Sequence, residues 1–387
     1  MQNHPDFRRL LLNPVFDTRQ SALDTQKTPV SFAHPYGQRL SEYEQLTLYN
    51  QPNPDWIGGG LGLGGWTTHF PGGRGPWENY FTEARTVDWF AFRDPEGLWE
   101  RPYVSQKADD WRTLQRNAQT AGKRAYYQQI DADWLWKVLD THATALAFHD
   151  YALFMAHGAP IRDVLSDALR NVTVNAAFDY LDNAQTLIAH RVYLDKSNDD
   201  FSADPAIGQE TWDRDARWQG ARHLVQELWG NASYDHVEIL FAIHAIHEPL
   251  FGRHLRDDFL IGNAARHGDH LSAQILSASI RGAERAQSWA RELFFRTLAQ
   301  DPEYGDYNRT LFAYWARKWL PLEAAALRDI SPLWQSTATL DGADGRQRHQ
   351  ARLAHTVAQW HADWGGLMGD AARHIDVPGL AGSGRAA

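Results

Sequence analysis

The chain has 387 residues. It contains 38 Lys and Arg and 48 Asp and Glu, so its formal net charge is −10 at pH 7. This acidic balance argues against a nucleic-acid partner, which requires surplus positive charge. Cysteine is absent, which excludes disulfides, thiolate catalysis and cysteine-ligated clusters. The N-terminus lacks a signal-peptide core, and no run of about 18 uncharged apolar residues occurs. We therefore expect a cytoplasmic protein without membrane contact.

The N-terminal third is poor in helical pattern. Four prolines in residues 1–40 deny this segment a continuous helix, which predicts an extended N-terminal arm. Ser41 and Glu44 then form a capping box, so a helix is predicted from here to about Gln51. The segment 41–106 as a whole is predicted to be rich in loops.

Nine glycines fall between positions 58 and 75, and Gly60–Gly65 satisfies the pattern G-x-G-x-x-G. A dinucleotide site would need a strand before this pattern and a helix after it. Pro52 and Pro54 precede the glycines and Pro71 follows them, which fits neither requirement. We interpret the segment as a structural glycine loop that lets another backbone approach closely.

Beyond this region, apolar residues recur at the spacing of one helix face. The clearest such stripe starts at Pro160 and continues to Val192. Further helical patterns begin at Lys107 and cover about Trp134–His157, Arg214–Trp229, Tyr234–Leu260, Leu271–Leu298, Asn308–Arg328 and Arg348–His374. Long helices joined by short turns pack as an antiparallel bundle. The sequence thus predicts an all-α protein with one helical domain over residues 41–376 and a flexible tail over 377–387.

The 18 histidines raise the question of a metal site. A di-iron bundle takes Glu-x-x-His from two helices, and no histidine here has Glu or Asp three residues before it. At about 100° per residue, His236, His247 and His254 would share one helix face, although Pro249 interrupts the segment. We favour buried or interface histidines. The alternative is a stand-alone metalloprotein with an unorthodox His-rich site around His244 and His247.

Two smaller groups of polar residues also invite a functional interpretation. His149 and Asp150 are better explained as a polar contact inside or between bundles. Asp301, Glu303 and Asp306 resemble a carboxylate cluster, but they surround a proline and a glycine just before a predicted helix. We interpret them as a loop that starts this helix.

Tryptophan is the most over-represented residue, with 17 in the chain. Trp and Arg are enriched at the centres of protein interfaces, although a large aromatic core would also explain the excess of Trp. The block from residue 56 to 89 combines both residue types with many glycines. It supplies the candidate interface residues, which are Trp56, Trp66, Arg74, Trp77, Arg85, Asp88 and Trp89.

Several ordered segments resemble one known family. The most specific are Leu40–Glu44, Gln51–Ile57, Arg85–Phe90, Arg93–Pro95 and Asp301–Thr310. In these segments the chain is similar to the β subunit of the hydroxylase component of soluble di-iron monooxygenases of the methane and butane type. The likeness covers most of the chain and weakens before Leu40 and after about Ile330.

The resemblance implies a ferritin-like bundle that has lost its metal ligands, so no catalytic, cofactor or metal residue is expected in this chain. It also implies a bacterial (αβγ)2 hydroxylase whose α subunit holds the di-iron centre. A regulatory protein and a reductase with NADH, FAD and a 2Fe-2S cluster complete the enzyme, which oxidises an alkane with O2. Gly62, Leu63 and Gly65 depart from the methane-type pattern, which favours butane or a similar short alkane.

Overall fold

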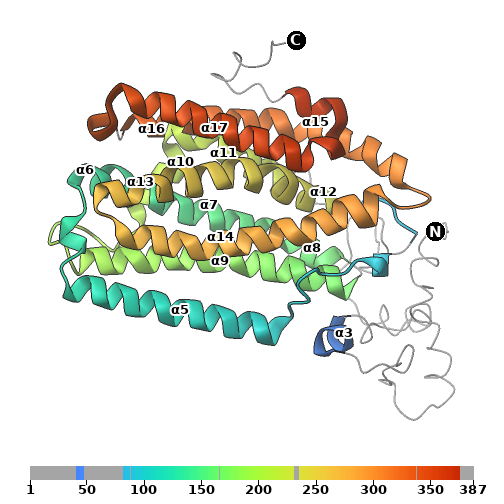
Figure 1. Ribbon diagram of the computed structural model, residues 1–387, viewed down its shortest axis with the longest axis horizontal. Helices are drawn as coiled ribbons and strands as arrows, with labels where there is room; N and C mark the ends of the chain where they lie inside the picture. The colour runs from blue at the N-terminus through green and yellow to red at the C-terminus, as the bar shows by residue number, and fades with distance from the viewer. Residues whose placement is uncertain are drawn as a thin grey trace.

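The structure, a computed structural model, describes residues 41–47, 82–87, 89–164, 166–230, 235–336 and 338–374. These residues form helices and no strand, which confirms the predicted all-α class. The long helices run side by side in stacked layers (Figure 1). Across the described ranges, no helix is long and apolar enough to cross a bilayer. The predicted arm over 1–40 and tail over 377–387 lie outside these ranges.

Long helices build the bundle, and several continue into π-helical segments. The main elements are α5 (Glu100–Lys123), η5 (Leu135–Ala143), α7 (Thr144–Ala156), α9 (Asp167–Asp195), α11 (Gln219–Gly230), α12 (His236–Phe241), η7 (Ala242–Gly252), η8 (His254–Ile261), α14 (His270–Arg291), η10 (Glu292–Ala299), α15 (Gly305–Ile330) and α17 (Ala338–Met368). Shorter elements are α3 (Glu42–Thr47), η3 (Trp89–Ala91), η4 (Tyr127–Gln129), α6 (Ala132–Trp134), α8 (Gly158–Asp163), α10 (Ala206–Arg214), η6 (Ala216–Trp218), α13 (Gly262–Ala264), η9 (Ala265–His267), α16 (Leu333–Ser336) and η11 (Gly369–His374).

The capping box predicted at the start of α3 is present. The backbone N–H of Ser41 donates to Glu44 Oε2 at 2.8 Å, and the backbone N–H of Glu44 donates to Ser41 Oγ at 3.2 Å. Each side chain thus satisfies a backbone donor that the first turn leaves free. The predicted continuation to Gln51 lies outside the described residues beyond Thr47.

Four predicted helix starts were wrong. The helices expected from Arg214 and Arg348 begin at Gln219 (α11) and Ala338 (α17). The helix expected to run unbroken from Pro160 instead ends at Asp163, and α9 begins at Asp167. Val164 is extended, and the Ser166 hydroxyl accepts from the backbone N–H of Leu169, so a new N-cap interrupts the apolar stripe. Helix α5 begins at Glu100 rather than near Lys107, because a proline is tolerated in a first helical turn.

The helix expected from Tyr234 to Leu260 is wound differently from an ideal α-helix. It starts as α12 and continues as the π-helical segments η7 and η8. Pro249 lies within η7 and does not end the helix. A proline removes one intrahelical hydrogen bond, but η8 is π-helical without a proline, so Pro249 alone does not account for the winding. The α-helical angles used to group the histidines therefore do not apply here.

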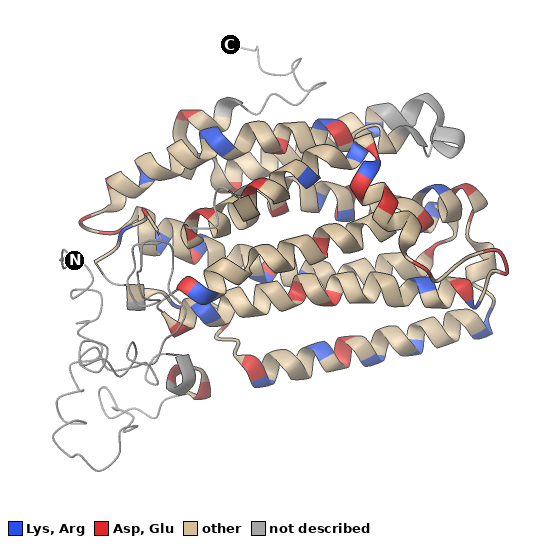
Figure 2. Cartoon of the chain, turned by 180° about the vertical axis from the view of Figure 1, so that it is seen from behind, with Lys and Arg blue, Asp and Glu red and all other residues tan. Residues whose placement is uncertain are grey.

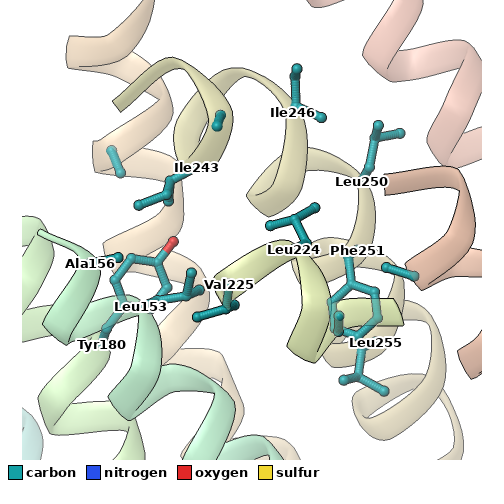
Figure 3. Close-up of a cluster of buried hydrophobic side chains, with 14 of the residues drawn as sticks. Leu153, Ala156, Tyr180, Leu224, Val225, Ile243, Ile246, Leu250, Phe251 and Leu255 are labelled. Atoms are coloured by element: carbon teal, nitrogen blue, oxygen red, sulfur yellow. The ribbon is translucent and has the colours of Figure 1, made fainter. Parts of the chain in front are cut away.

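The core is centred on η7, whose residues are buried except for the half-buried Pro249. Ile243 of η7 points toward side chains of α7 and α9, whereas Ile246 and Leu250 point to the opposite side of the helix (Figure 3). Many tryptophans also pack into this core. Those that are fully buried are Trp134, Trp218, Trp289, Trp315, Trp319, Trp360 and Trp364. A large aromatic core therefore accounts for a good part of the Trp excess.

Candidate functional site

Polar side chains from five helical elements meet inside the bundle, and we call this group the core polar cluster. All its members are exposed by at most 5%. They are His149 and Asp150 of α7, His157 directly after α7, Tyr180 of α9, His244, His247 and Glu248 of η7, Arg256 of η8 and Glu323 of α15. Ferritin-like bundles place metal and cofactor sites at this position, between facing helices. The cluster is therefore the place to look for chemistry.

Arg256 joins two carboxylates on different helices. Its Nη2 donates to Asp150 Oδ1 at 2.9 Å, and its Nη1 donates to Glu248 Oε1. The Tyr180 hydroxyl donates to the other oxygen of Glu248 at 2.8 Å. Burial opposes the ionised form of Asp150, but Arg256 and His149 outweigh it and lower the pKa of Asp150. The guanidinium is thus held between two buried carboxylates.

A chain of hydrogen bonds leads from Asp150 to Glu323. His149 Nδ1 lies 2.9 Å from Asp150 Oδ1, and its Nε2 lies 2.8 Å from His247 Nε2. His247 Nδ1 lies 2.7 Å from Glu323 Oε2. Because Asp150 is ionised, His149 donates through Nδ1 and accepts at Nε2, so His247 carries a proton on Nε2. Burial lowers the pKa of His149 to about 4 and raises the pKa of Glu323, which His247 opposes.

A second histidine pair lies beside this chain. His157 donates from Nδ1 to the carbonyl of Leu153 at 2.7 Å, and its Nε2 lies 3.0 Å from His244 Nε2. His157 must accept at Nε2, so His244 donates there. Burial lowers the pKa of His157 to about 4 and holds the pKa of His244 well below its usual value. Both rings are therefore neutral near pH 7.

The cluster does not have the arrangement of a di-iron centre. Its carboxylates Asp150 and Glu248 face a guanidinium, and the histidine nitrogens face one another. Within the described ranges, no group of three or more His, Asp or Glu side chains is placed to hold a metal ion. What the arrangement does provide is an ion-pair network of Asp150, Arg256 and Glu248 that links α7, η7 and η8, although Asp150 Oδ2 and Arg256 Nε have no hydrogen-bond partner among the described residues.

The histidines of the Tyr234–Leu260 segment are buried, as we favoured, since four of them are exposed by at most 1%. They do not share one face. His236 lies 6.2 Å from the Trp89 ring, and His254 stacks on Trp334 at 4.3 Å, whereas His244 and His247 contact α7. The π winding of η7 and η8 separates the residues that α-helical angles would group.

The two smaller polar groups also have clear positions. His149 and Asp150 form the predicted contact inside the bundle. Asp301 Oδ1 accepts from the backbone N–H groups of Glu303 and Tyr304, directly before α15, which confirms the helix-start loop. Asp301 Oδ2 also accepts from Val87 at 2.8 Å, so this loop holds the 82–87 segment against the bundle.

Two of the seven interface candidates, Arg85 and Trp89, fall on described residues. Trp56, Trp66, Arg74, Trp77 and Asp88 lie outside the described ranges. Arg85 is exposed, and its guanidinium lies 4.8 Å from the ring centroid of Tyr307. Trp89 is only 3% exposed and belongs to the core of this chain. Arg85 is thus available to a partner, whereas Trp89 offers little surface.

Sequence reasoning missed five members of the core polar cluster. In the sequence Tyr180 is one more apolar residue of its stripe, and nothing local assigns a role to the other four. These are His157, Glu248, Arg256 and Glu323. The sequence did contain a sign of buried ionic residues, because Arg256 follows Glu248 by eight residues within one predicted helix. A long polar side chain in such a helix must find a buried partner. The identity of that partner was not readable, since Asp150 is 106 residues away.

The chain matches a family model described as methane, phenol and alkene hydroxylase over residues 66–301. It is 39% identical over 336 residues to the methane monooxygenase component A beta chain of Methylosinus trichosporium, which covers 87% of this chain and 85% of that one. The same component of Methylococcus capsulatus is 35% identical over 345 residues, covering 89% and 88%. The small subunit of the propane 2-monooxygenase hydroxylase of Mycolicibacterium goodii is 29% identical over 315 residues, covering 80% and 81%.

Solved structures show the same fold at low sequence identity. Phenol hydroxylase from Pseudomonas sp. OX1 superimposes with a TM-score of 0.66 at 16% identity, covering 86% of this chain and 96% of that one. Toluene 4-monooxygenase gives a TM-score of 0.63 at 18% identity, covering 79% and 98%. The predicted ferritin-like bundle is thereby confirmed. The chain belongs to the methane, phenol and alkene hydroxylase family, as a β subunit of the hydroxylase component of a soluble di-iron monooxygenase.

Proposed function

We propose that this chain is the non-catalytic, structural β subunit of an alkane monooxygenase that uses NADH and O2. It supports the α subunit, which holds the di-iron centre, and contributes to the surface on which other components dock. The observation that carries this proposal is Arg256, which joins Asp150 and Glu248 inside the bundle. A guanidinium stays charged at any physiological pH, so it repels a metal cation and occupies the carboxylates that would bind one.

The core polar cluster supports a structural role for a second reason. Burying a charge is costly unless it is paired, and each ionic member of the cluster has a partner on another turn or helix. Such a network stabilises one arrangement of the helices.

The proposed partners follow from the family. The hydroxylase would be an (αβγ)2 assembly, served by a regulatory protein and by a reductase that carries FAD and a 2Fe-2S cluster. The relatives named beta chain and small subunit support the presence of a larger subunit. The block from Trp56 to Trp89 is proposed to contact these subunits, with the exposed Arg85 as its most accessible described residue. We expect the complex in the bacterial cytoplasm.

The proposed substrate is a short-chain alkane, butane or methane, which the complex oxidises to the alcohol. Relatives act in methane and propane monooxygenases, which supports this size range. Gly62, Leu63 and Gly65 differ from the methane-type pattern and favour butane. Because the substrate cavity belongs to the α subunit, these residues would act only through subunit packing.

Co-purification of the native complex tests the proposal. A tagged form of this chain should retain a larger subunit that carries two Glu-x-x-His motifs. Iron measured after the subunits are separated should follow the larger chain, with well under one iron per copy of this one. Reconstitution with reductase and NADH should oxidise butane faster than methane or propane. Two irons on this chain would contradict the non-catalytic assignment and favour the alternative around His244 and His247.

A further inference from the structure

The outward sides of α7 and α9 form one apolar surface, which we call the α7–α9 face. Its main residues are Tyr151, Phe154 and Met155 of α7 with Val174, Phe178 and Val192 of α9. Tyr151 and Met155 are each 49% exposed and Phe178 is 48% exposed. The Phe154 ring lies 5.8 Å from Tyr151 and 6.5 Å from Phe178, so the surface is continuous across the two helices.

The α7–α9 face is nearly free of charge. The ionisable side chains of α7, His149 and Asp150, are fully buried. Between Asn171 and Val192 on α9, Asp182 is the one charged residue that is not buried, and it pairs with Lys107 at 2.8 Å. In Figure 2 acidic and basic residues alternate along α5, the lowest helix, whereas the helices above it are mostly tan. A helix that is apolar all round is normally covered on every side.

A groove of about 670 Å³ runs between α5 and α9 at the edge of this face. Val104, Val174 and Phe178 supply apolar parts of its lining, and Val104 is 54% exposed. The charged residues of the lining are paired within the described part of the chain, Arg170 with Asp167 and Lys107 with Asp182, except for the exposed Glu100. Pockets of this kind, next to a flat apolar surface, are where large side chains of a partner insert at the centre of interfaces. The face therefore combines a flat part with a recess.

We propose that the α7–α9 face is the surface on which the larger hydroxylase subunit packs, with uncharged helices of that subunit laid across α7 and α9. The inference rests on the proposed function and adds the site of contact. A partner with a charged surface would bury those charges unpaired here, because α7 offers no outward charge to meet them. The complementary surface must therefore be apolar as well.

The partner on this face must stay bound permanently, which distinguishes the larger subunit from the other components. Exposed apolar side chains that adjoin one another, such as Tyr151, Met155 and Phe178, favour aggregation unless a partner covers them. A reductase or regulatory protein that associates transiently would leave it bare between encounters, whereas permanent interfaces are typically apolar. Relatives named beta chain and small subunit point to a different, larger chain rather than a second copy.

A charge placed in the centre of the face tests the inference. Phe178→Glu and Met155→Glu, each co-expressed with the larger subunit, should weaken its binding by about 100-fold or more, because a buried unpaired carboxylate costs several kcal/mol. Tyr314→Glu on α15 is the matched control, since Tyr314 is 63% exposed and lies outside the face. Complex mass is measured by light scattering after gel filtration, and affinity by titration of the separated subunits.

Two further measurements complete the test. The free full-length variants should keep the helical circular dichroism and melting temperature of the wild type, because the replaced side chains are half exposed. In the wild-type complex, amide exchange should slow in peptides that cover residues 148–156 and 172–182. Unchanged exchange in both peptides on addition of the larger subunit would contradict the inference.

The outcomes separate this inference from the proposed function. If wild type and all variants bind the larger subunit equally, the α7–α9 face is wrong and the proposed function stands. If wild type binds no larger subunit, the proposed function fails as well. If the free wild-type chain is a dimer that Phe178→Glu dissociates, while binding of the larger subunit is unchanged, the face joins two copies and the inference is overturned.

Discussion

His149 on α7 and His247 on η7 face each other through their Nε2 atoms, 2.8 Å apart, and neither side chain reaches solvent. One of these nitrogens must donate and the other accept. A proton on His149 Nε2 would place it against the N–H group of His247. The packing of α7 against η7 therefore depends on a neutral His149.

We predict that the chain loses stability in mild acid. Burial lowers the pKa of His149 and His157 from 6.5 to about 4, so the unfolded chain binds more protons than the folded one between these values. The free energy of unfolding is therefore highest above pH 6.5. It decreases as the pH falls toward 4, by about 1.4 kcal/mol per pH unit for each of the two histidines.

Urea unfolding followed by circular dichroism at several pH values from 7 to 4.5 measures this slope. His157→Gln should reduce it, whereas His355→Gln, at an exposed position, should not. An unfolding free energy that is independent of pH over this range would refute the assignment of neutral buried rings.

Arg256→Met should destabilise the chain strongly. Its removal leaves Asp150 and Glu248, exposed by 0% and 3%, without their cation, and breaking a buried ion pair in this way costs about 3–5 kcal/mol. Adding Asp150→Asn and Glu248→Gln should restore part of the loss. The control is Arg214→Met, whose ion pair with Glu210 is solvent-exposed. Equal melting temperatures of the two single variants would contradict the prediction.

Asp301→Ala should release the 82–87 segment from the bundle. The side chain accepts from the backbone of Val87, Glu303 and Tyr304, and we expect a loss of about 1–3 kcal/mol when these donors become unpaired. Amide exchange of Val87 should accelerate more than exchange at the centre of α15. Asp306→Ala in the same loop region is the control, since its side chain is fully exposed.

Arg85 and Trp89 should give opposite phenotypes. Trp89→Ala should unfold the free chain more easily by about 3–5 kcal/mol, because the ring is buried in its own core. Arg85→Glu should leave the melting of the free chain nearly unchanged and reduce both the mass of the complex and its monooxygenase activity. An Arg85→Glu complex that assembles and turns over like wild type would remove Arg85 from the proposed interface.

The sequence by itself determined the features that depend on neighbouring residues. The apolar spacing in Leu271–Leu298 and Asn308–Arg328 predicted helices that the structure has at His270–Ala299 and Gly305–Ile330. The capping box at Ser41 and the helix-start role of Asp301 were also correct, because a cap is made by residues within one turn. Local hydrogen bonds and helical periodicity depend on residues that are close together in the sequence.

Only the tertiary structure decided which buried polar groups meet and how η7 is wound. The bond between Arg256 and Asp150 spans 106 residues, and the contact between His149 and His247 spans 98. The free energy of such pairs depends on how whole helices are placed relative to one another. A short stretch of sequence does not determine this placement. The π winding of η7, which continues through Pro249, likewise had no signal in the apolar spacing. Long-range packing thus determined which residues pair in the core polar cluster.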